Sequence, residues 1–315
     1  MQLIDVRYPF DENLIPDEPV VLAMGFFDGV HKGHQQVLAQ ARKLADEKGV
    51  KMAILTYDHH PTIVFKNVPT QFQYLTTWKR KQEVFDDMGA DIVYRVSFTS
   101  KLAKLTPQEF TDKFMVGFHA LAVVAGFDHT YGPKDTATME NLPKYAAGRF
   151  EVHSIPAFEV DGAKVGSTRI RAAIDGGMVD TANELLGYIY KTTGLVVHGQ
   201  AIGRTIGYPT ANILTTNGER VPGVGVYAVR IKIGAAWYDA MASVGYNETF
   251  GEDRPKTVEI FIFDFSEEIY GENVEVLWNH FLRGMVKFNG VEALIDQLKA
   301  DDWDSREYFK TLSKK

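Results

Sequence analysis

Two histidines three residues apart are the first side chains whose type and spacing suggest chemistry. His31 and His34 lie in the segment Gly25–His34, between an apolar run and a helical pattern. A helix N-terminus presents unpaired backbone N–H groups and a positive dipole end, which favours phosphate. Two imidazoles in the first helical turn face one way and could donate hydrogen bonds to a triphosphate and to charge developing at its α-phosphorus. The segment predicts a nucleotidyl-transfer site, although metal ligands or ordinary surface histidines would show the same spacing.

A second anion-binding site is predicted where a later helix begins. Ser167 or Thr168 can cap that helix, and hydroxyl groups, backbone amides and the guanidinium of Arg169 together would clamp an anion. An arginine at a helix start opposes the helix dipole, so an anionic ligand would explain its position. Helix capping alone is the alternative interpretation.

The glycine-rich segment 199–212 predicts phosphoryl transfer of a different kind. Its three glycines are Gly199, Gly203 and Gly207. Thr210 and Asn212 follow them, and hydroxyl and amide oxygens suit Mg²⁺. A glycine loop with Mg²⁺ ligands is the minimum equipment for phosphoryl transfer, which depends on positioning and charge neutralisation. A mobile turn is the alternative.

A single carboxylate interrupts a later apolar run. In strand alternation, Glu259 shares a face with Phe261 and Phe263. It is either a general base aimed into a cavity or an edge-strand charge that protects against aggregation. The residues alone leave both open.

Apolar runs that alternate with helical patterns must position the first two sites. Strands are predicted at Val20–Phe27, Met52–Tyr57, Asp91–Val96 and Ala120–Phe127. An apolar stripe predicts a helix from Gly33 to about Glu47, and Thr106 with Pro107 and Glu109 marks another helix start. Strands separated by helices predict a parallel sheet covered on both faces, with ligands at the carboxyl ends of the strands.

The second half changes to the period of strands. Strands are predicted at Gly194–Gly199, Val226–Ile233, Trp237–Val244, Thr257–Phe265 and Asn273–Trp278, followed by a helical pattern at Val291–Lys299. Five or six short strands at this spacing indicate an antiparallel barrel. The boundary is expected near Gly187.

Composition agrees with a two-domain globular protein. The chain has 315 residues, 45% hydrophobic and 24% charged. A net charge of −7 argues against a large nucleic-acid surface, and the absence of cysteine excludes disulfides and Cys-ligated zinc. No signal peptide or apolar run of membrane-spanning length is found. A cytoplasmic protein that binds neither nucleic acid nor membrane is the expectation.

The first half of the chain resembles the nucleotidyltransferase half of the prokaryotic bifunctional riboflavin kinase/FAD synthetases. That family has a Gly-Xaa-Phe-Asp-Gly-Xaa-His-Xaa-Gly-His segment, a Thr-Phe-Asp-Pro-His-Pro segment, a Gly-Phe-Asp segment and a Ser-Ser-Thr-Arg-Ile-Arg segment. The matching segments, in the same order and spacing, are Gly25–His34, Thr56–Pro61, Gly126–Asp128 and Gly166–Arg171.

Three segments depart from the family pattern. His59 replaces a proline, Gly166 replaces a serine, and His129-Thr130-Tyr131-Gly132 replaces Phe-Arg-Phe-Gly. The arginine of that last segment is therefore absent, and Lys134 is a candidate substitute. Asp58-His59-His60 also spells a signature of metal-dependent phosphoesterases, but their further Asp-rich motifs are not found.

The second half resembles the riboflavin kinase barrel of the same family. Gly199–Asn212 matches Gly-Xaa-Xaa-Xaa-Gly-Arg-Xaa-Xaa-Gly-Phe-Pro-Thr-Ala-Asn with Tyr208 in place of phenylalanine. Thr257–Phe265 matches Thr-Val-Glu-Xaa-His-Xaa-Xaa-Asp-Phe with Phe261 in place of histidine. Arg283 ends a matching Phe-Leu-Arg.

The resemblance implies a fold and two reactions. The fold is α/β, a Rossmann-like nucleotidyltransferase domain at residues 1–186 followed by an antiparallel six-stranded β-barrel riboflavin kinase domain with a C-terminal helix at residues 187–315. ATP would phosphorylate riboflavin to FMN and then adenylylate FMN to FAD, with Mg²⁺ as cofactor. Riboflavin, FMN and ATP are the expected partners of a monomer or weak homo-oligomer.

The resemblance also implies roles for single residues. Glu259 would be the base for the riboflavin 5′-hydroxyl, His31 and His34 would be catalytic in adenylyl transfer, and Thr210 and Asn212 would bind Mg²⁺. The implied nucleotide-binding residues are Gly25, Phe26, Asp28, Gly33, Ser167, Thr168, Arg169, Gly199, Gly203, Arg204, Gly207, Pro209, Thr210 and Asn212, and the implied flavin-binding residues are Asp58, His60, Asp128 and Arg283.

Two other functions stay open. One is a flavin-binding regulatory protein that has lost one activity or both. The other is a nucleotidyltransferase for another acceptor, such as pantetheine phosphate or nicotinate nucleotide, which leaves the barrel unexplained.

Overall fold

The computed structural model describes residues 1–67, 72–199, 202–246 and 256–312. The chain packs as two units, and each is described by itself. The first consists of Met1–Phe72 and Thr76–Gly166, and the second of Gln73–Leu75 and Ser167–Lys315. These units are defined by packing. The predicted boundary after residue 186 instead divides the chain by activity, and it stays a prediction.

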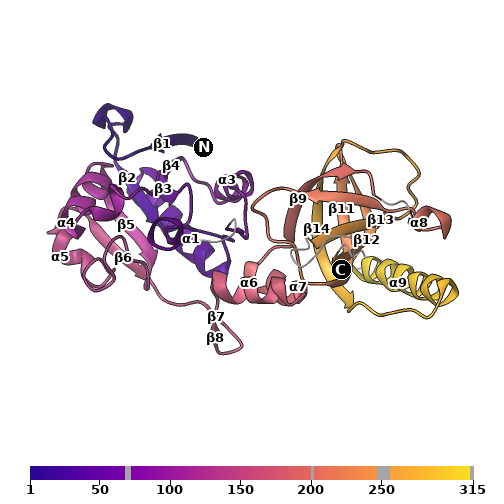
Figure 1. Cartoon of the computed structure of the whole chain (residues 1–315). Coiled ribbons are helices and arrows are strands. Elements are labelled where there is room, and N and C mark those ends of the chain that lie inside the picture. The colour runs from indigo at the N-terminus through magenta and orange to yellow at the C-terminus, as the bar shows by residue number, and fades with distance from the viewer. Residues whose placement is uncertain (68–71, 200–201, 247–255, 313–315) are drawn as a thin grey trace. The chain divides into compact units, whose positions relative to one another are not determined.

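A six-stranded sheet forms the centre of the first unit, with all neighbouring strands parallel and in the order β1-β4-β3-β2-β5-β6 (Figure 1). Its strands are β1 Gln2–Val6, β2 Val20–Met24, β3 Lys51–Tyr57, β4 Ile92–Val96, β5 Ala120–Gly126 and β6 Glu151–Ile155. The four predicted strands and their parallel arrangement are confirmed. β2 ends at Met24, short of the predicted Phe27, because Phe27 takes a left-handed φ of 55°.

Helices and short turns connect these strands. They are η1 Glu12–Leu14, α1 Lys32–Lys48, α2 Thr62–Phe65, α3 Trp78–Asp87, η2 Leu102–Lys104, α4 Pro107–Phe110, the π-helix η3 Thr111–Val116 and α5 Leu142–Ala146, and a hairpin of β7 Glu159–Val160 and β8 Ala163–Lys164 follows β6. The predicted capping box is present, since Thr106 and Glu109 exchange hydrogen bonds at the start of α4.

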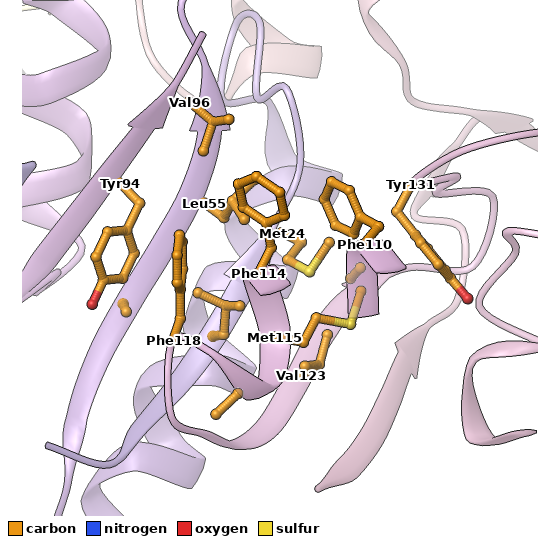
Figure 2. Packing of buried hydrophobic residues seen from close by; sticks show 14 of the residues in the cluster. Met24, Leu55, Tyr94, Val96, Phe110, Phe114, Met115, Phe118, Val123 and Tyr131 are labelled. Atoms are coloured by element: carbon orange, nitrogen blue, oxygen red, sulfur yellow. The ribbon is translucent and has the colours of Figure 1, made fainter. Parts of the chain in front are cut away.

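Alternate side chains of β2 divide between two cores, one on each face of the sheet. Val21 and Ala23 belong to the cluster that receives the buried stripe of α1. Leu22 and Met24 belong to the other cluster, in which Figure 2 shows Met24 among aromatic rings. The second core is rich in rings, and Tyr94 and Phe118 lie 4.3 Å apart there. A central strand buried on both faces reads as a continuous apolar run, which is why its sequence signal is strong.

The second unit contains a closed antiparallel barrel of six strands in the order β10-β13-β12-β11-β14-β9 (Figure 1). Its strands are β9 Tyr190–Val197, β10 Ala211–Thr215, β11 Gly225–Ile233, β12 Ala236–Tyr246, β13 Lys256–Ile262 and β14 Asn273–Arg283, and its helices are α6 Ser167–Asp175, α7 Val179–Leu186, α8 Ile202–Thr205 and the C-terminal α9 Val291–Leu312. The predicted barrel and C-terminal helix are confirmed. The predicted pattern did not contain β10, a short strand directly after a Gly- and Pro-rich loop.

Side chains of α6 and α7 attach these helices to the barrel. Asp175 at the end of α6 accepts two 2.6 Å hydrogen bonds from Arg220. The Asn183 amide on α7 donates to the Trp278 carbonyl at 2.9 Å and accepts from the Tyr190 N–H at 2.7 Å. The helix that begins with Ser167 therefore packs as part of the second unit. Within the described ranges, no helix is long and apolar enough to cross a membrane.

Candidate active sites

The loop between β2 and α1 holds a backbone conformation that few sequences tolerate. Phe27 and Val30 have φ angles of 55° and 32°, and Gly29 has 83°. Positive φ is rare for a β-branched residue, and such strain persists only where the surroundings over-determine it. Gly25 is required by space, because a Cβ there would lie 2.8 Å from the Phe27 ring. The conformation of this loop is therefore more constrained than a simple connection between β2 and α1 requires.

His31 and His34 are placed by the first turn of α1. His31 is the N-cap residue, and its Nδ1 accepts a hydrogen bond from the His34 N–H at 3.3 Å. The two rings stack with their centroids 3.6 Å apart and an angle of 16° between planes. Gly33 leaves room for the His31 ring, whose nearest atoms would lie 3.4 Å from an added Cβ. The structure confirms that both imidazoles share one side of the helix start.

Burial keeps these imidazoles neutral. Desolvation lowers the pKa of His31 to about 4, although the charge of Asp28 opposes the shift. Desolvation also holds the pKa of His34 well below its usual value, and the neighbouring His31 and Lys81 add to the effect. A neutral imidazole keeps one N–H to donate and one nitrogen to accept. The helix N-terminus therefore offers hydrogen-bonding groups without fixed charge.

A third histidine, which the motifs did not single out, belongs to the same neighbourhood. His129 follows β5, and its field is one of the causes that lower the pKa of His34. Desolvation lowers the pKa of His129 itself to about 4. In the described part of the chain, His34 Nδ1 and His129 Nε2 are buried without a hydrogen-bond partner. The departure from Phe-Arg-Phe at residues 129–131 was the signal that marked this position.

Strand order explains why loops far apart in sequence meet here. β3 and β4 lie on one side of β2, whereas β5 and β6 lie on the other. The loops after β2 and β5 therefore flank the point where the order of strands reverses. Open parallel sheets bind ligands in the crevice at this position. His31 and His34 approach it from one loop and His129 from the other.

Two of the predicted flavin contacts follow β3 on the same edge of the sheet. Asp58 Oδ1 accepts hydrogen bonds from the backbone N–H groups of His59 at 2.8 Å and Phe98 at 3.1 Å. The His60 ring stacks on Phe72 at 4.8 Å and meets the edge of Phe26 at 4.9 Å. The rings of Phe26, His60 and Phe72 therefore lie together beside the loop between β2 and α1.

The third predicted flavin contact is paired with a lysine from the β7–β8 hairpin. Lys164 donates a hydrogen bond to Asp128 Oδ2, and its Nζ lies 4.8 Å from the centre of the Phe127 ring. Its charge is also among the causes that lower the pKa of His31. Lys164 therefore supplies a cation near the segment from which the arginine of the family is absent. Both Lys164 and the candidate substitute Lys134 are exposed.

The predicted anion clamp begins α6. Ser167, Thr168 and Arg169 form its first turn, and Ile170 is buried. Because α6 packs within the second unit, an approach of this clamp to His31 and His34 stays a prediction.

In the barrel, the predicted metal ligands and base lie together. The Thr210 hydroxyl donates to Glu259 Oε2 at 3.2 Å. Asn212 on β10 and Ser243 on β12 are the residues directly opposite Glu259 on β13. Directly opposed residues share a face of the sheet. Oxygen groups of three neighbouring strands therefore gather on one side of the barrel.

The edge-charge interpretation of Glu259 does not hold. β13 pairs with β10 on one side and β12 on the other, and the barrel is closed. Further along the same face, Phe263 packs with Phe309 of α9, and Phe261 meets Tyr208 at 4.9 Å. Glu259 is thus exposed at the end of a face that is otherwise covered by apolar groups.

Each predicted glycine of the barrel loop has a structural reason. A Cβ at Gly199 would lie 2.1 Å from the Asn212 amide nitrogen, and one at Gly203 would lie 2.1 Å from the Tyr208 carbonyl oxygen. Gly207 has a φ of 86°. The loop is a close backbone approach to the oxygen cluster rather than an unconstrained turn. Residues 200 and 201 lie outside the described residues. Arg204 on α8 and Pro209 are exposed.

Comparisons with known proteins match both halves of this arrangement. The family model for FAD synthetase matches residues 15–169, and the model for riboflavin kinase matches residues 186–309. A bifunctional riboflavin kinase/FMN adenylyltransferase from Listeria monocytogenes is 46% identical over 99% of both chains. The chain belongs to this family. The Bacillus subtilis member is 36% identical over the full length of both chains.

A solved structure has the same fold over nearly the whole chain. It is described as a macrolide-efflux protein from Streptococcus pneumoniae, with 38% identity, a TM-score of 0.89, and coverage of 96% of this chain and 99% of that one. The efflux description belongs to that protein. What carries over is the fold, in which the parallel sheet and the barrel occur in one chain.

Within this family assignment, Arg283 shows a contact that its motif did not indicate. Its guanidinium makes two hydrogen bonds to Asp301 of α9, at 2.7 and 2.6 Å. Asp301 is 2% exposed, so the pair joins the end of β14 to the C-terminal helix. A flavin contact of Arg283 stays a prediction.

The oxygen donors of the barrel also fit a hard cation. Among the described residues, no group of three or more His, Asp or Glu side chains could hold a metal ion. Thr210 and Asn212 instead offer hydroxyl and amide oxygens, the class that accompanies water and phosphate around Mg²⁺. The donor set suits a cation that arrives with the nucleotide.

Proposed function

We propose that the chain makes FAD from riboflavin in two consecutive reactions, one at the barrel and one at the parallel sheet. The barrel transfers the γ-phosphoryl group of ATP to riboflavin and releases FMN and ADP. The adenylyl-transfer site built on the parallel sheet then joins FMN to the AMP portion of a second ATP and releases pyrophosphate. The observation that carries this is the presence, in one chain, of the Thr210–Glu259 pair in the barrel and the stacked histidines at the start of α1.

Glu259 provides the base for the first reaction. Its carboxylate takes the proton of the riboflavin 5′-hydroxyl as that oxygen attacks the γ-phosphorus and the bond to the ADP oxygen breaks. A hydroxyl is a weak nucleophile until a positioned base accepts its proton. The Thr210 hydroxyl, which donates to Glu259 Oε2 at 3.2 Å, fixes the carboxylate.

Mg²⁺ would be held by Thr210 and Asn212 together with ATP phosphates. When bound, it neutralises charge on the β- and γ-phosphates. Gly199 and Gly203 let the backbone approach this region, because their neighbours leave no space for a side chain.

The second reaction needs no base of its own. The FMN phosphate is already anionic at neutral pH, and its oxygen attacks the α-phosphorus while the bond to pyrophosphate breaks. His31 and His34 donate hydrogen bonds to the phosphates and to charge that develops in this displacement. Each imidazole, kept neutral by burial, retains one N–H for this donation.

Other residues hold the two substrates. The backbone of Gly25, Phe26 and Gly33 and the carboxylate of Asp28 shape the triphosphate site, and Ser167, Thr168 and Arg169 form the second anion clamp. Asp58, His60 and Asp128 border the flavin of FMN, and Arg283 contacts riboflavin in the barrel. Arg204, Gly207 and Pro209 complete the ATP loop.

We assign residues 1–186 to adenylyl transfer and 187–315 to phosphorylation, which agrees with a kinase family match that starts at residue 186. We also propose that the protein acts in the cytoplasm as a monomer or weak homo-oligomer and that it binds no nucleic acid. The net charge of −7 supports the last of these proposals.

The test is to incubate the protein with riboflavin and Mg-ATP and to separate the flavins by chromatography. FMN followed by FAD supports the proposal. Riboflavin that binds but stays unchanged would indicate a flavin-binding regulator instead, and consumption of another acceptor without flavin turnover would indicate a different nucleotidyltransferase.

A further inference from the structure

A buried lysine outside the motifs contacts the loop between β2 and α1, residues 25–31, which is called the glycine loop below. Lys81 is on α3 and is 3% exposed. Its Nζ donates a hydrogen bond to the Phe26 carbonyl at 2.7 Å and lies 4.2 Å from the centre of the Phe26 ring. Burying an ammonium group is costly unless it is paired and hydrogen-bonded. The fold therefore keeps this charge at a cost, and its contacts are with the loop that receives phosphate.

The turn that leads into α3 holds the same loop at two further points. The Thr76 hydroxyl accepts a hydrogen bond from the Gly29 N–H at 3.0 Å. The Thr76 N–H donates to Asp28 Oδ1 at 3.3 Å. Asp28 and Thr76 are both buried. Residues 76–81 thus brace the loop through Phe26, Asp28 and Gly29 in succession.

The loop needs such bracing because its backbone is strained. The positive φ angles of Phe27 and Val30 are unfavourable for residues other than glycine and persist only when neighbouring groups enforce them. The Phe26 carbonyl, directly before the first strained residue, accepts a second hydrogen bond from the Thr56 hydroxyl at 3.0 Å. Lys81 is the charged member of this pair of donors.

We propose that Lys81 is a positioning residue for adenylyl transfer: its ammonium group holds the Phe26 carbonyl so that the glycine loop and His31 keep the arrangement that receives the triphosphate. This rests on the proposed function of the first unit. The hydrogen bond from Lys81 fixes the Phe26 carbonyl oxygen toward α3. The positive charge also lies close enough to His34 to help keep that imidazole neutral.

The state of Lys81 depends on pH in a range that assays can reach. Desolvation lowers the pKa of Lys81 to about 8, and the carboxylate of Asp28 opposes the shift. The titratable groups around it are Asp28 in the loop, His34 on α1 and His60, which touches the Phe26 ring. Above pH 8 the free enzyme loses the ammonium charge, so the hold on the Phe26 carbonyl weakens.

The first test is Lys81→Met, with Lys79→Met as the matched control, since Lys79 is an exposed lysine of the same helix. We expect kcat/KM for ATP in FAD synthesis from FMN to fall about 100-fold, the size of effect that a small misplacement of reacting groups produces. The control should stay within about twofold of the wild type, and riboflavin phosphorylation should be unchanged in both. FAD synthesis within about twofold of the wild type in folded Lys81→Met would overturn the proposal.

The second test is Lys81→Arg, which keeps the charge at every assay pH. For the wild type, kcat/KM for ATP should decline above pH 8, because this parameter reports the free enzyme. The Arg variant should lack that decline, while the kinase profile stays the same. The same decline in both proteins, or loss of FAD synthesis only through unfolding of both variants, would assign Lys81 a purely structural role. Wild-type FAD formation from FMN tests the proposed function separately.

Discussion

The two sites use ATP in different ways, and the side chains in each reflect the nucleophile. The barrel site contains a carboxylate, Glu259, that is exposed and hydrogen-bonded to Thr210. The site on the parallel sheet contains His31 and His34 in neutral form, at the start of a helix. A hydroxyl must lose a proton during attack, so the barrel needs a base. The phosphate of FMN carries its charge already, so the sheet site needs only donors.

The two sites also differ in the backbone that holds their side chains. On the sheet, the loop after β2 is strained and braced by buried groups. On the barrel, the oxygen groups lie on adjacent strands whose register sets their spacing. The strained loop fixes the backbone at the proposed phosphate site, whereas aligned strands hold side chains at a fixed separation. Separate scaffolds also imply that each reaction can be removed alone.

Loss of Glu259, the proposed base of the barrel, should give the largest effect. Glu259→Gln keeps the size of the side chain but cannot accept the proton, so we expect FMN formation to fall about 10²–10⁴-fold. FAD formation from added FMN should be unchanged. Chromatography of both reactions is the measurement, and Glu267→Gln, an exposed carboxylate outside the barrel strands, is the control. Equal losses in both reactions would remove the distinction between the sites.

Loss of the capping histidine should give the reverse pattern. His31 caps α1, and we propose that it also donates to phosphate. His31→Asn separates the two roles better than His31→Ala, because asparagine can still accept the hydrogen bond of an N-cap. We expect FAD formation from FMN to fall about 10²–10³-fold and riboflavin phosphorylation to persist. His153→Asn on β6 is the control. Full adenylylation by the variant would show that the cap alone mattered.

The two units should respond to pH in opposite directions through their buried groups. The pKa of His31 is about 4 in the folded chain against 6.5 ordinarily. The unfolded chain therefore binds more protons between these values, and stability falls as pH is lowered through that range. In the second unit, desolvation raises the pKa of Glu219 from 4.5 to about 7. There the folded state binds more protons, so the contribution of Glu219 is lost as pH rises from 4.5 to 7.

Each contribution is worth roughly 3 kcal/mol, at about 1.4 kcal/mol per pKa unit. The measurement is denaturant unfolding of the wild type, His31→Asn and Glu219→Gln between pH 4.5 and 7.5. The difference from wild type should change with pH in opposite senses for the two variants. Parallel curves would show that these groups do not titrate as their burial implies.

The smallest effect is expected at Arg283, the proposed riboflavin contact of the barrel. Arg283→Lys keeps a charge but loses the paired contact with Asp301, so the orientation of the cation changes. We expect KM for riboflavin to rise about tenfold, because the variant would lose one charge-assisted hydrogen bond to the substrate. FAD formation from FMN should be unaffected. An unchanged KM together with a lower unfolding midpoint would place Arg283 in the structure alone.

Local patterns predicted the parts of the molecule that depend on neighbours in sequence. The stripe from Val37 to Ala45, the Thr106 cap and the histidines of α1 were all visible, because helix periodicity and capping are local. Thr210, Asn212 and Glu259 were found by motif. The structure adds that register brings Glu259 opposite Asn212.

The features that the sequence did not predict depend on contacts between segments that lie far apart in the chain. Lys81 meets Phe26 across 55 positions, and His129 reaches the neighbourhood of His34 from another strand. These side-chain interactions are with segments far away in sequence, so no periodic signal marks them. Arg283 was identified, but its pairing with Asp301 required the packing of α9 against the barrel.

The central claim is that two separate sites act in succession, and mixing two variants tests it most directly. Glu259→Gln and His31→Asn are incubated with riboflavin and Mg-ATP, first alone and then together, and the flavins are separated by chromatography. The account predicts almost no product from Glu259→Gln alone, FMN without FAD from His31→Asn alone, and FAD from the mixture. FAD from either variant alone at the wild-type rate, or none from a mixture of folded proteins, would contradict it.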